Sequence, residues 1–284
     1  FYIIQGPAEG FVSVEMLTWL TVALLSLGIF IVVELKSSYP MFDFTVFRNK
    51  RFAGAIMGSI GMNFSFWPFI IYLPLLFEIG FGYGTLFTGI CLLAYTLPSL
   101  VMPPVAENLT LRFGARWIIP TGLFLIGAGF LWMRYGTAVE HAGWQSLLGG
   151  MLISGIGLGL TNTPVTNTAT SEVSRDRVGM ASGIDTSARL ITLAINIALM
   201  GLVLISGITS GMQKLMPNQN IGVVRKIAEQ LNSVENMVKL DLQFSKTQLS
   251  LVITDAFSDV LLFGGLGVWA LALLSFIFFG AKSK

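Results

Sequence analysis

The chain has very little of the chemistry that enzymes use. Its 284 residues include a single cysteine, Cys91, and a single histidine, His141, and only 11% of them are charged. A lone cysteine excludes a disulfide within the chain, and a lone histidine without other ligands around it is a poor metal site. The sequence also lacks HExxH, GxSxG and the Walker loop that binds nucleotides. We therefore expect no enzymatic activity, no metal and no cofactor.

Apolar sequence, in contrast, is abundant, with 54% of the residues hydrophobic. Apolar runs recur between clusters of charge, glycine and proline, and about 20 helical residues cross a hydrocarbon core of roughly 30 Å. The runs are continuously apolar rather than alternating, which favours helices over barrel strands. We predict an all-α polytopic membrane protein with seven transmembrane helices, at residues 14–33, 52–77, 85–105, 117–135, 144–165, 184–208 and 252–279.

The positive residues indicate how these helices are oriented. Lysine and arginine gather in the connections 35–51, 106–116 and 166–183. Because short cytoplasmic connections carry an excess of these residues, we expect all three to be cytoplasmic. The carboxy terminus is then cytoplasmic and the amino terminus external. The connection 209–251 also carries lysine and arginine, but long loops cross the membrane largely regardless of charge, so we expect it to be external.

This long external connection contains one segment with helical periodicity. Val224, Ile227, Ala228 and Leu231 are spaced to share one face of a helix, with charged residues between them. The pattern favours an amphipathic helix lying on the membrane surface, with a disordered loop as the alternative.

One predicted helix carries a stripe of polar residues. Asp185, Arg189, Thr192 and Asn196 advance by four, three and four positions, which brings them to one side of a helix. Charged groups are too costly to face lipid tails, so the stripe faces other helices or water. Asp185 and Arg189 are placed to pair with each other. The pair is either a gate or helix anchor, or takes a direct part in handling substrate or protons.

Two other helices carry polar and aromatic groups. Ser59, Asn63 and Trp67 align on the second predicted helix, and Asn162 and Thr163 precede a proline on the fifth. Amide and hydroxyl groups form hydrogen bonds without a charge, and aromatic faces bind flat apolar or cationic molecules. With Thr192 and Asn196, these residues are candidates for a substrate cavity, although helix packing alone would also account for them.

Three segments resemble one known family. SSYPMFDFTVFRNKRFAG resembles the connection before its last six helices. PVAENLTLRFGAR resembles the pattern P-x-x-G-x-L-x-D-R-x-G-x-R, although Glu107 and Leu111 depart from it, and RVGMASGIDTSAR resembles R-x-G-x-A-S-G with its following arginine. Together they resemble the carboxy-terminal half of a drug:proton antiporter of the fourteen-span, EmrB/QacA-type branch of the major facilitator superfamily. The matching residues are Leu109, Arg112, Gly114, Arg116, Arg177, Gly179, Ala181, Ser182, Gly183 and Arg189.

The resemblance implies a particular domain organisation. Residues 1–51 would form an external turn, one helix of a linker pair and a cytoplasmic linker, and residues 52–284 a six-helix carboxy-terminal bundle. It also implies a cavity shared with an amino-terminal bundle, in the same chain or in a partner. A cytoplasmic gate would include Arg112, Gly114, Arg116, Arg177, Asp185 and Arg189.

The resemblance also implies a function and a location. We expect proton-driven efflux of small amphipathic or lipophilic compounds across a bacterial inner membrane. The partners would then be substrate, protons and the lipid bilayer, and not nucleic acid. The alternatives are an exporter of a specific metabolite, sugar or siderophore with the same fold, and a half-transporter subunit that does not itself transport.

Overall fold

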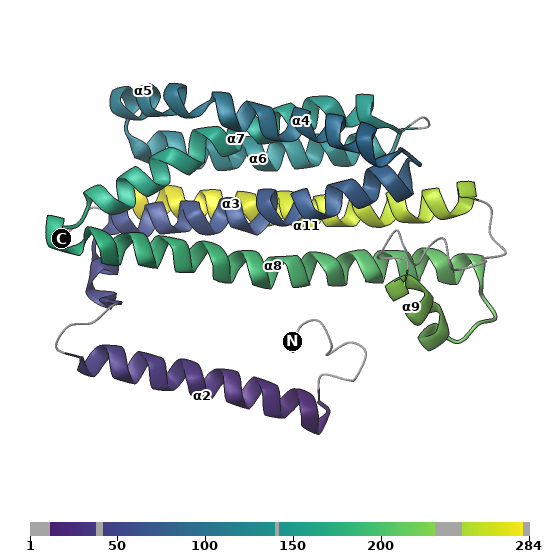
Figure 1. Ribbon diagram of the computed structural model, residues 1–284, viewed down its shortest axis with the longest axis horizontal. Helices are drawn as coiled ribbons and strands as arrows, with labels where there is room; N and C mark the ends of the chain where they lie inside the picture. Colours follow the sequence, from purple (N-terminus) through teal and green to yellow (C-terminus); the bar gives the residue numbers. More distant parts are fainter. Residues whose placement is uncertain (1–11, 38–41, 140–141, 231–245, 281–284) are drawn as a thin grey trace.

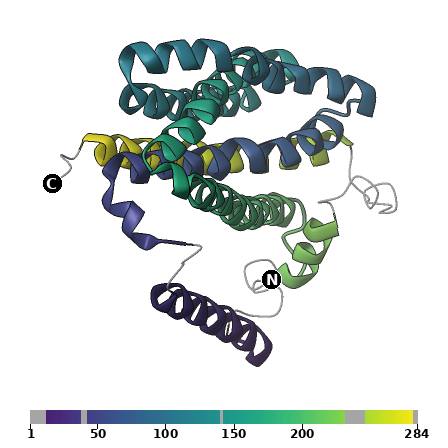
Figure 2. The same ribbon diagram turned by 60° about the vertical axis from the view of Figure 1, so that its left-hand side comes forward.

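The computed structural model describes residues 12–37, 42–139, 142–230 and 246–280, and within these ranges its regular elements are all helices (Figure 1). The first is α2, Val14–Lys36. It stands apart from the other long helices in both ribbon views (Figures 1 and 2), and Met16 is its one buried residue. Such a helix, apolar on all sides, needs a lipid or protein environment around it.

The remaining long helices form one bundle. They are α3 (Lys50–Leu75), α4 (Thr85–Val101), α5 (Pro103–Phe113), α6 (Ala115–Thr137), α7 (Trp144–Ser171), α8 (Val178–Leu215) and α11 (Lys246–Gly280). Three short helical turns lie next to these helices. η1 (Phe44–Arg48) precedes α3, the π-helical η2 (Leu76–Gly80) extends α3, and η3 (Arg175–Arg177) leads into α8.

Five of the described helices, α2, α3, α6, α8 and α11, are long and apolar enough to span a membrane, and α4 with α5 makes a sixth if the pair is one span. This is a multi-pass arrangement. At 28 residues α7 is long enough, but its many glycines and threonines make it less apolar than those five. Seven spans therefore stay a prediction.

The span predicted over residues 85–105 corresponds to two helices that meet at a bend. α4 ends at Val101, α5 begins at Pro103, and the two helix axes differ by 43°. Pro103 and Pro104 have no backbone N–H to continue the hydrogen-bonding pattern of α4, and their rings clash with the preceding turn. Proline is tolerated at the start of a helix, so the chain bends here and begins again.

The long connection after α8 is partly helical. α8 continues seven residues past the predicted end, to Leu215, and α9 (Ile221–Gln230) follows. An amphipathic helix is thus confirmed at residues 221–230, and α9 lies beside α8 in Figure 1 with Val224 and Ala228 fully buried. Its place on the membrane surface stays a prediction. Residues 231–245 lie outside the described residues.

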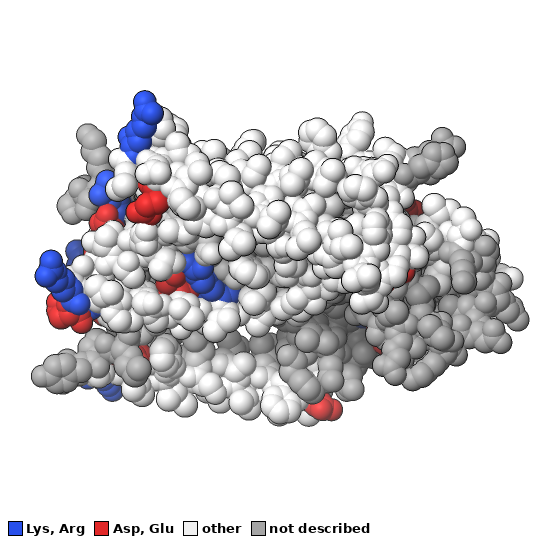
Figure 3. Space-filling view, turned by 45° about the horizontal axis from the view of Figure 1, so that its top comes forward, with Lys and Arg blue, Asp and Glu red and all other residues white. Residues whose placement is uncertain are grey.

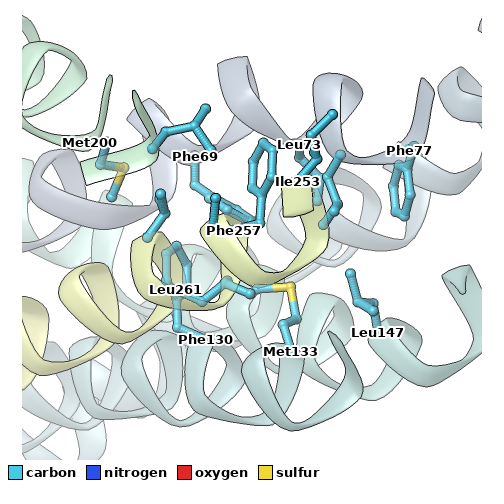
Figure 4. Close-up of a cluster of buried hydrophobic side chains, with 14 of the residues drawn as sticks. Phe69, Leu73, Phe77, Phe130, Met133, Leu147, Met200, Ile253, Phe257 and Leu261 are labelled. Atoms are coloured by element: carbon cyan, nitrogen blue, oxygen red, sulfur yellow. The ribbon is translucent and has the colours of Figure 1, made fainter. Parts of the chain in front are cut away.

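An apolar core fills the half of the bundle nearer α9. Figure 4 shows Phe69, Phe130 and Phe257, from α3, α6 and α11, packed together with Leu73, Ile253 and Leu261 around them. The ring centroids of Phe69 and Phe130 are 4.9 Å apart, and those of Phe69 and Phe257 are 6.5 Å apart. We call these three rings and their buried neighbours the aromatic cluster.

Glycines let α6 and α7 come into backbone contact. A Cβ atom on Gly129 would lie 2.5 Å from the carbonyl oxygen of Gly150, and one on Gly150 would lie equally close to that of Gly129. No real Cβ is found at such distances, so larger residues would separate the helices. Lipid tails are as apolar as the side chains, so no hydrophobic force draws the helices together, and such close packing is a main source of helix association.

Most of the described arginines lie at the opposite end of the bundle from α9. Here lie the start of α3, the turn between α5 and α6, and the connection between α7 and α8. On the face in Figure 3, most blue and red side chains lie at the left, and the middle is mostly white. We call this the basic end, after its arginines Arg51, Arg112, Arg116, Arg175 and Arg177.

Candidate functional site: a buried polar network between α3, α7 and α8

The centre of the site is an ion pair on α8. Arg189 Nη2 lies 3.0 Å from Asp185 Oδ2, and Arg189 Nε donates to the same oxygen at 3.1 Å. The exposed fractions are 5% for the Asp185 side chain and 19% for that of Arg189. A charge pair this deeply buried is tolerated only when further hydrogen bonds satisfy its remaining donors and acceptors.

The carboxylate of Asp185 receives these bonds from two neighbouring helices. Ser59 on α3 donates its hydroxyl to Oδ1, and Thr166 on α7 donates to Oδ2 at 3.3 Å. Ser59 is fully buried. Its carbonyl accepts a bond of 2.9 Å from the side-chain amide of Asn63, one turn further along α3. Asp185 thus joins α3, α7 and α8 at one point.

The guanidinium of Arg189 adds two bonds to α7. Nη1 donates to Asn162 Oδ1 and Nη2 to Thr166 Oγ1, both at 2.7 Å. Asn162 and Thr166 are one helical turn apart, so they present their oxygens side by side to the planar fork of the arginine. We refer to Ser59, Asn162, Thr166, Asp185 and Arg189 as the polar network.

Sequence reasoning found four of these five residues and missed Thr166. The hydroxyl of Thr166 both accepts from Arg189 and donates to Asp185, so it closes the network. The available signal was its spacing of four residues from Asn162, which places both on one face of α7. The predicted contact between Asp185 and Arg189 is confirmed.

Asn196, the last residue of the predicted stripe, makes a different contact between α3 and α8. It is 1% exposed, and its side-chain amide donates to the backbone carbonyl of Phe64. Within a regular helix the N–H of residue 68 would serve that carbonyl, but Pro68 has none. Asn196 therefore supplies from α8 the donor that α3 lacks. One turn beyond Pro68 on α3, the hydroxyl of Tyr72 donates to the carbonyl of Ile197 at 2.7 Å.

The other three cavity candidates lie outside the polar network. Thr163 and Thr192 are half-buried, and neither makes a side-chain hydrogen bond with another described residue. Trp67 is 38% exposed and rests edge-on against Phe66, with 5.9 Å between ring centroids. Their role as a substrate surface stays a prediction.

The predicted gate arginines near the α5–α6 turn have aromatic neighbours. The Cζ of Arg112 lies 5.2 Å from the ring centroid of Phe113. That of Arg116 lies 5.6 Å from the ring of Trp117 and 5.3 Å from the ring of Phe276. Neither arginine forms an ion pair with a described carboxylate. Gly114 separates α5 from α6 at a φ of +85°, a conformation that glycine adopts without strain.

Glu107, one of the two departures from the family pattern, makes a contact of its own at this end. Its carboxylate accepts a bond of 2.8 Å from the side-chain amide of Asn167, which ties α5 to α7.

Arg177 pairs with the linker before α3. Its Nη1 lies 2.7 Å from Asp43 Oδ2. Hydrogen bonds from the hydroxyl and backbone N–H of Thr45 lower the pKa of Asp43, and the charge of Arg177 adds to the effect. A second pair joins Arg51 and Glu172 at 3.1 Å, with Asn49 Nδ2 donating to Glu172 at 3.0 Å. Linker, α3 and the α7–α8 connection are thus held together at the basic end.

Comparison with known proteins finds one family and a set of curated relatives. Residues 34–195 match the sequence profile of the Major Facilitator Superfamily, a range that contains the whole polar network. The multidrug resistance protein Stp of Mycobacterium tuberculosis is 30% identical over 213 residues, which cover 75% of this chain and 39% of Stp. The quinolone resistance protein NorB of Staphylococcus aureus is 29% identical over 230 residues, covering 78% of this chain and 49% of NorB. The chain therefore spans about two fifths to one half of the length of these relatives.

Proposed function

The chain belongs to the Major Facilitator Superfamily, and from that premise we propose that it is the carboxy-terminal half of a proton-driven exporter of small amphipathic or lipophilic compounds. The relatives named for multidrug and quinolone resistance support the substrate class. The family's role in transport also supports the expectation that the chain is not an enzyme. The chain would work with an amino-terminal bundle, across a cavity that the two halves share.

The polar network is the observation that carries this proposal. Its five side chains bind three helices to one another through charge-assisted hydrogen bonds, deep enough in the bundle for Asp185 to be almost fully buried. We propose that the network is a gate element which holds the basic end of α3, α7 and α8 together in one state of the transport cycle. Such bonds are strong and directional, and they can break and form again. Substrate would shift the equilibrium by binding one state more tightly than the other.

We further propose seven spans, with the basic end in the cytoplasm, the amino terminus of this chain outside and the membrane a bacterial inner membrane. The support is the position of Arg51, Arg112, Arg116, Arg175 and Arg177, which lie at one end of the bundle. Trp67, Thr163 and Thr192 are our candidates for direct contact with substrate, because they keep exposed surface near the network. The proton-carrying carboxylate is expected in the amino-terminal half.

Transport by the full-length protein tests this function. It would be purified from its native membrane and reconstituted in vesicles with an imposed pH gradient, using ethidium and norfloxacin as probes. We expect uphill movement of both compounds, abolished by a protonophore. Movement that ignores the proton gradient would contradict the proton-driven mechanism. Transport confined to one class of metabolite would favour the specific exporter with the same fold.

The intact mass of the protein from its native membrane tests whether the two halves are one polypeptide. A mass near twice that of these 284 residues is the expected result. A mass near that of this chain alone, with a co-purifying partner and no flux, would instead favour a half-transporter subunit.

A further inference from the structure

A cavity of about 620 Å³ lies at the basic end, between the α5–α6 turn and the end of α7. It is separate from the polar network, with which it shares no residue. Arg51 and Arg116 supply positive charge to its wall, and Thr168 and Ser171 line it with small polar side chains. The remaining lining is mostly apolar and includes Leu111, Phe113, Trp117 and Phe279.

The electrostatics of this cavity favour an anion. Glu172 also lines it, but its carboxylate is already paired with Arg51 at 3.1 Å and accepts a bond from Asn49 at 3.0 Å. The charge of Arg116 has no such partner among the described carboxylates. α6 begins at Ala115, beside Arg116, without a side-chain cap. The positive end of its dipole therefore adds to the charge of the arginine.

The apolar part of the cavity distinguishes a lipid from a free anion. Leu111 is 79% exposed, and Phe113 and Trp117 are more than half exposed, so a hydrocarbon surface adjoins the charged wall. In a membrane protein this surface at a helix end meets the region where headgroups give way to acyl chains. Arg116 lies over the Trp117 and Phe276 rings, which hold its guanidinium at that boundary.

We propose that this cavity binds the phosphate headgroup of an anionic glycerophospholipid. Arg116 contacts the phosphate, the hydroxyls of Thr168 and Ser171 lie near the glycerol, and the acyl chains run along Leu111, Phe113 and Trp117. A basic cavity between transmembrane helices with an apolar rim suits such a lipid better than a neutral one. This site is independent of the proposed export function.

Lipid titration of the full-length protein tests the proposal. Native mass spectrometry would follow the binding of phosphatidylglycerol and phosphatidylcholine to detergent-purified protein, with inorganic phosphate as competitor. We expect tighter binding of phosphatidylglycerol, and no displacement by phosphate at millimolar concentration. Arg116→Gln should weaken phosphatidylglycerol binding about five-fold, as expected for one arginine at a membrane surface. Arg116→Lys should keep most of the affinity because it keeps the charge.

Arg112→Gln is the matched control. It removes one arginine from the same end of the bundle, but Arg112 does not line the cavity, so the affinity for phosphatidylglycerol should stay within two-fold of the wild type. Melting curves of all variants would confirm that each remains folded. Equal affinity for the two lipids, equal loss in Arg112→Gln and Arg116→Gln, or displacement by free phosphate would each overturn the proposal.

Discussion

Both halves of the bundle have apolar packing, but in the half nearer the basic end a buried ion pair adds to it. Toward α9, the aromatic cluster joins α3, α6 and α11 through fully buried rings such as Phe69, Phe130 and Phe257. Toward the basic end, a smaller apolar cluster that includes Phe52 and Ile184 is present, and the polar network also joins α3, α7 and α8 through an ion pair and hydrogen bonds. Apolar packing is non-directional, and removing buried atoms from it lowers the free energy of unfolding most, because a cavity is left behind. A polar network is directional, and one lost partner leaves the others unpaired. We therefore expect the first to set stability and the second to set the conformational cycle.

Removing a ring from the aromatic cluster should have the largest effect on stability. Phe257→Ala leaves a cavity among α3, α6 and α11 and should lower the free energy of unfolding by about 3–5 kcal/mol. Phe124→Ala is the control, because Phe124 is 54% exposed and stacks only on Trp269; its loss should cost about 1 kcal/mol. Denaturant unfolding of the full-length protein measures both. Transport per folded molecule should be unchanged in Phe257→Ala, and a loss there would remove the distinction between the two halves.

Breaking the polar network without changing its shape should affect transport more than stability. Thr166→Val removes the hydroxyl that bridges Asp185 and Arg189, at a cost of about 1–3 kcal/mol for the unpaired groups. We expect transport per folded molecule to fall at least ten-fold. Thr170→Val is the control on the same helix, since the Thr170 hydroxyl donates only to carbonyls of α7. Vesicle flux compares the two variants, and similar flux in both would show that the bridge has no role in the cycle.

The contact between Asn196 and Phe64 can be tested with a second substitution that compensates for the first. Asn196→Ala leaves the Phe64 carbonyl without a donor and should cost about 1 kcal/mol, as for other interhelical hydrogen bonds in membranes. Adding Pro68→Ala restores a backbone N–H four residues beyond Phe64. The double variant should recover most of the stability lost in Asn196→Ala. If Pro68→Ala is equally stabilising with Asn196 present, the proposed exchange of donors is wrong.

The linker pair Asp43–Arg177 should have the smallest effect. The pair lies at the surface, where the Arg177 side chain is 51% exposed, so Asp43→Asn should lower stability by at most about 1 kcal/mol. The pKa of Asp43 is lowered from 3.8, so its contribution is complete above that value and is lost only as the pH falls through the lowered one. The difference in melting temperature between Asp43→Asn and wild type should therefore stay constant from pH 5 to pH 8. A difference that disappears near pH 6 would contradict this assignment.

Hydrophobic runs and spacing predicted most of the fold and part of the site. Apolar runs identified most of the long helices, because a helix of about 20 apolar residues matches the thickness of the hydrocarbon core of a membrane. The spacing of Asp185 and Arg189 predicted their contact, because helix geometry alone decides it. The bend between α4 and α5 also has a local cause, because Pro103 and Pro104 have no backbone N–H to continue the hydrogen bonding of α4.

The unpredicted contacts depend on how helices meet. Thr166 reaches Asp185 only because α7 and α8 pack in one register. The carbonyl that Pro68 leaves free on α3 finds its donor on another helix, at Asn196. Arg112 and Arg116 were predicted as gate residues, and the fold gives them Phe113, Trp117 and Phe276 as aromatic neighbours. Register between helices, unlike periodicity within one, does not follow from a single sequence.

Charge exchange at the centre of the polar network tests the gate most directly. Asp185→Arg or Arg189→Asp alone leaves like charges facing each other in a buried site, and transport should be lost. The double exchange restores one charge of each sign within reach of Ser59, Asn162 and Thr166, whose hydroxyl and amide groups can each serve either charge. We expect it to recover transport in vesicles, at equal membrane levels of all variants. Recovery would support a gate that acts as a pair, whereas a folded double variant as inactive as the single ones would contradict it.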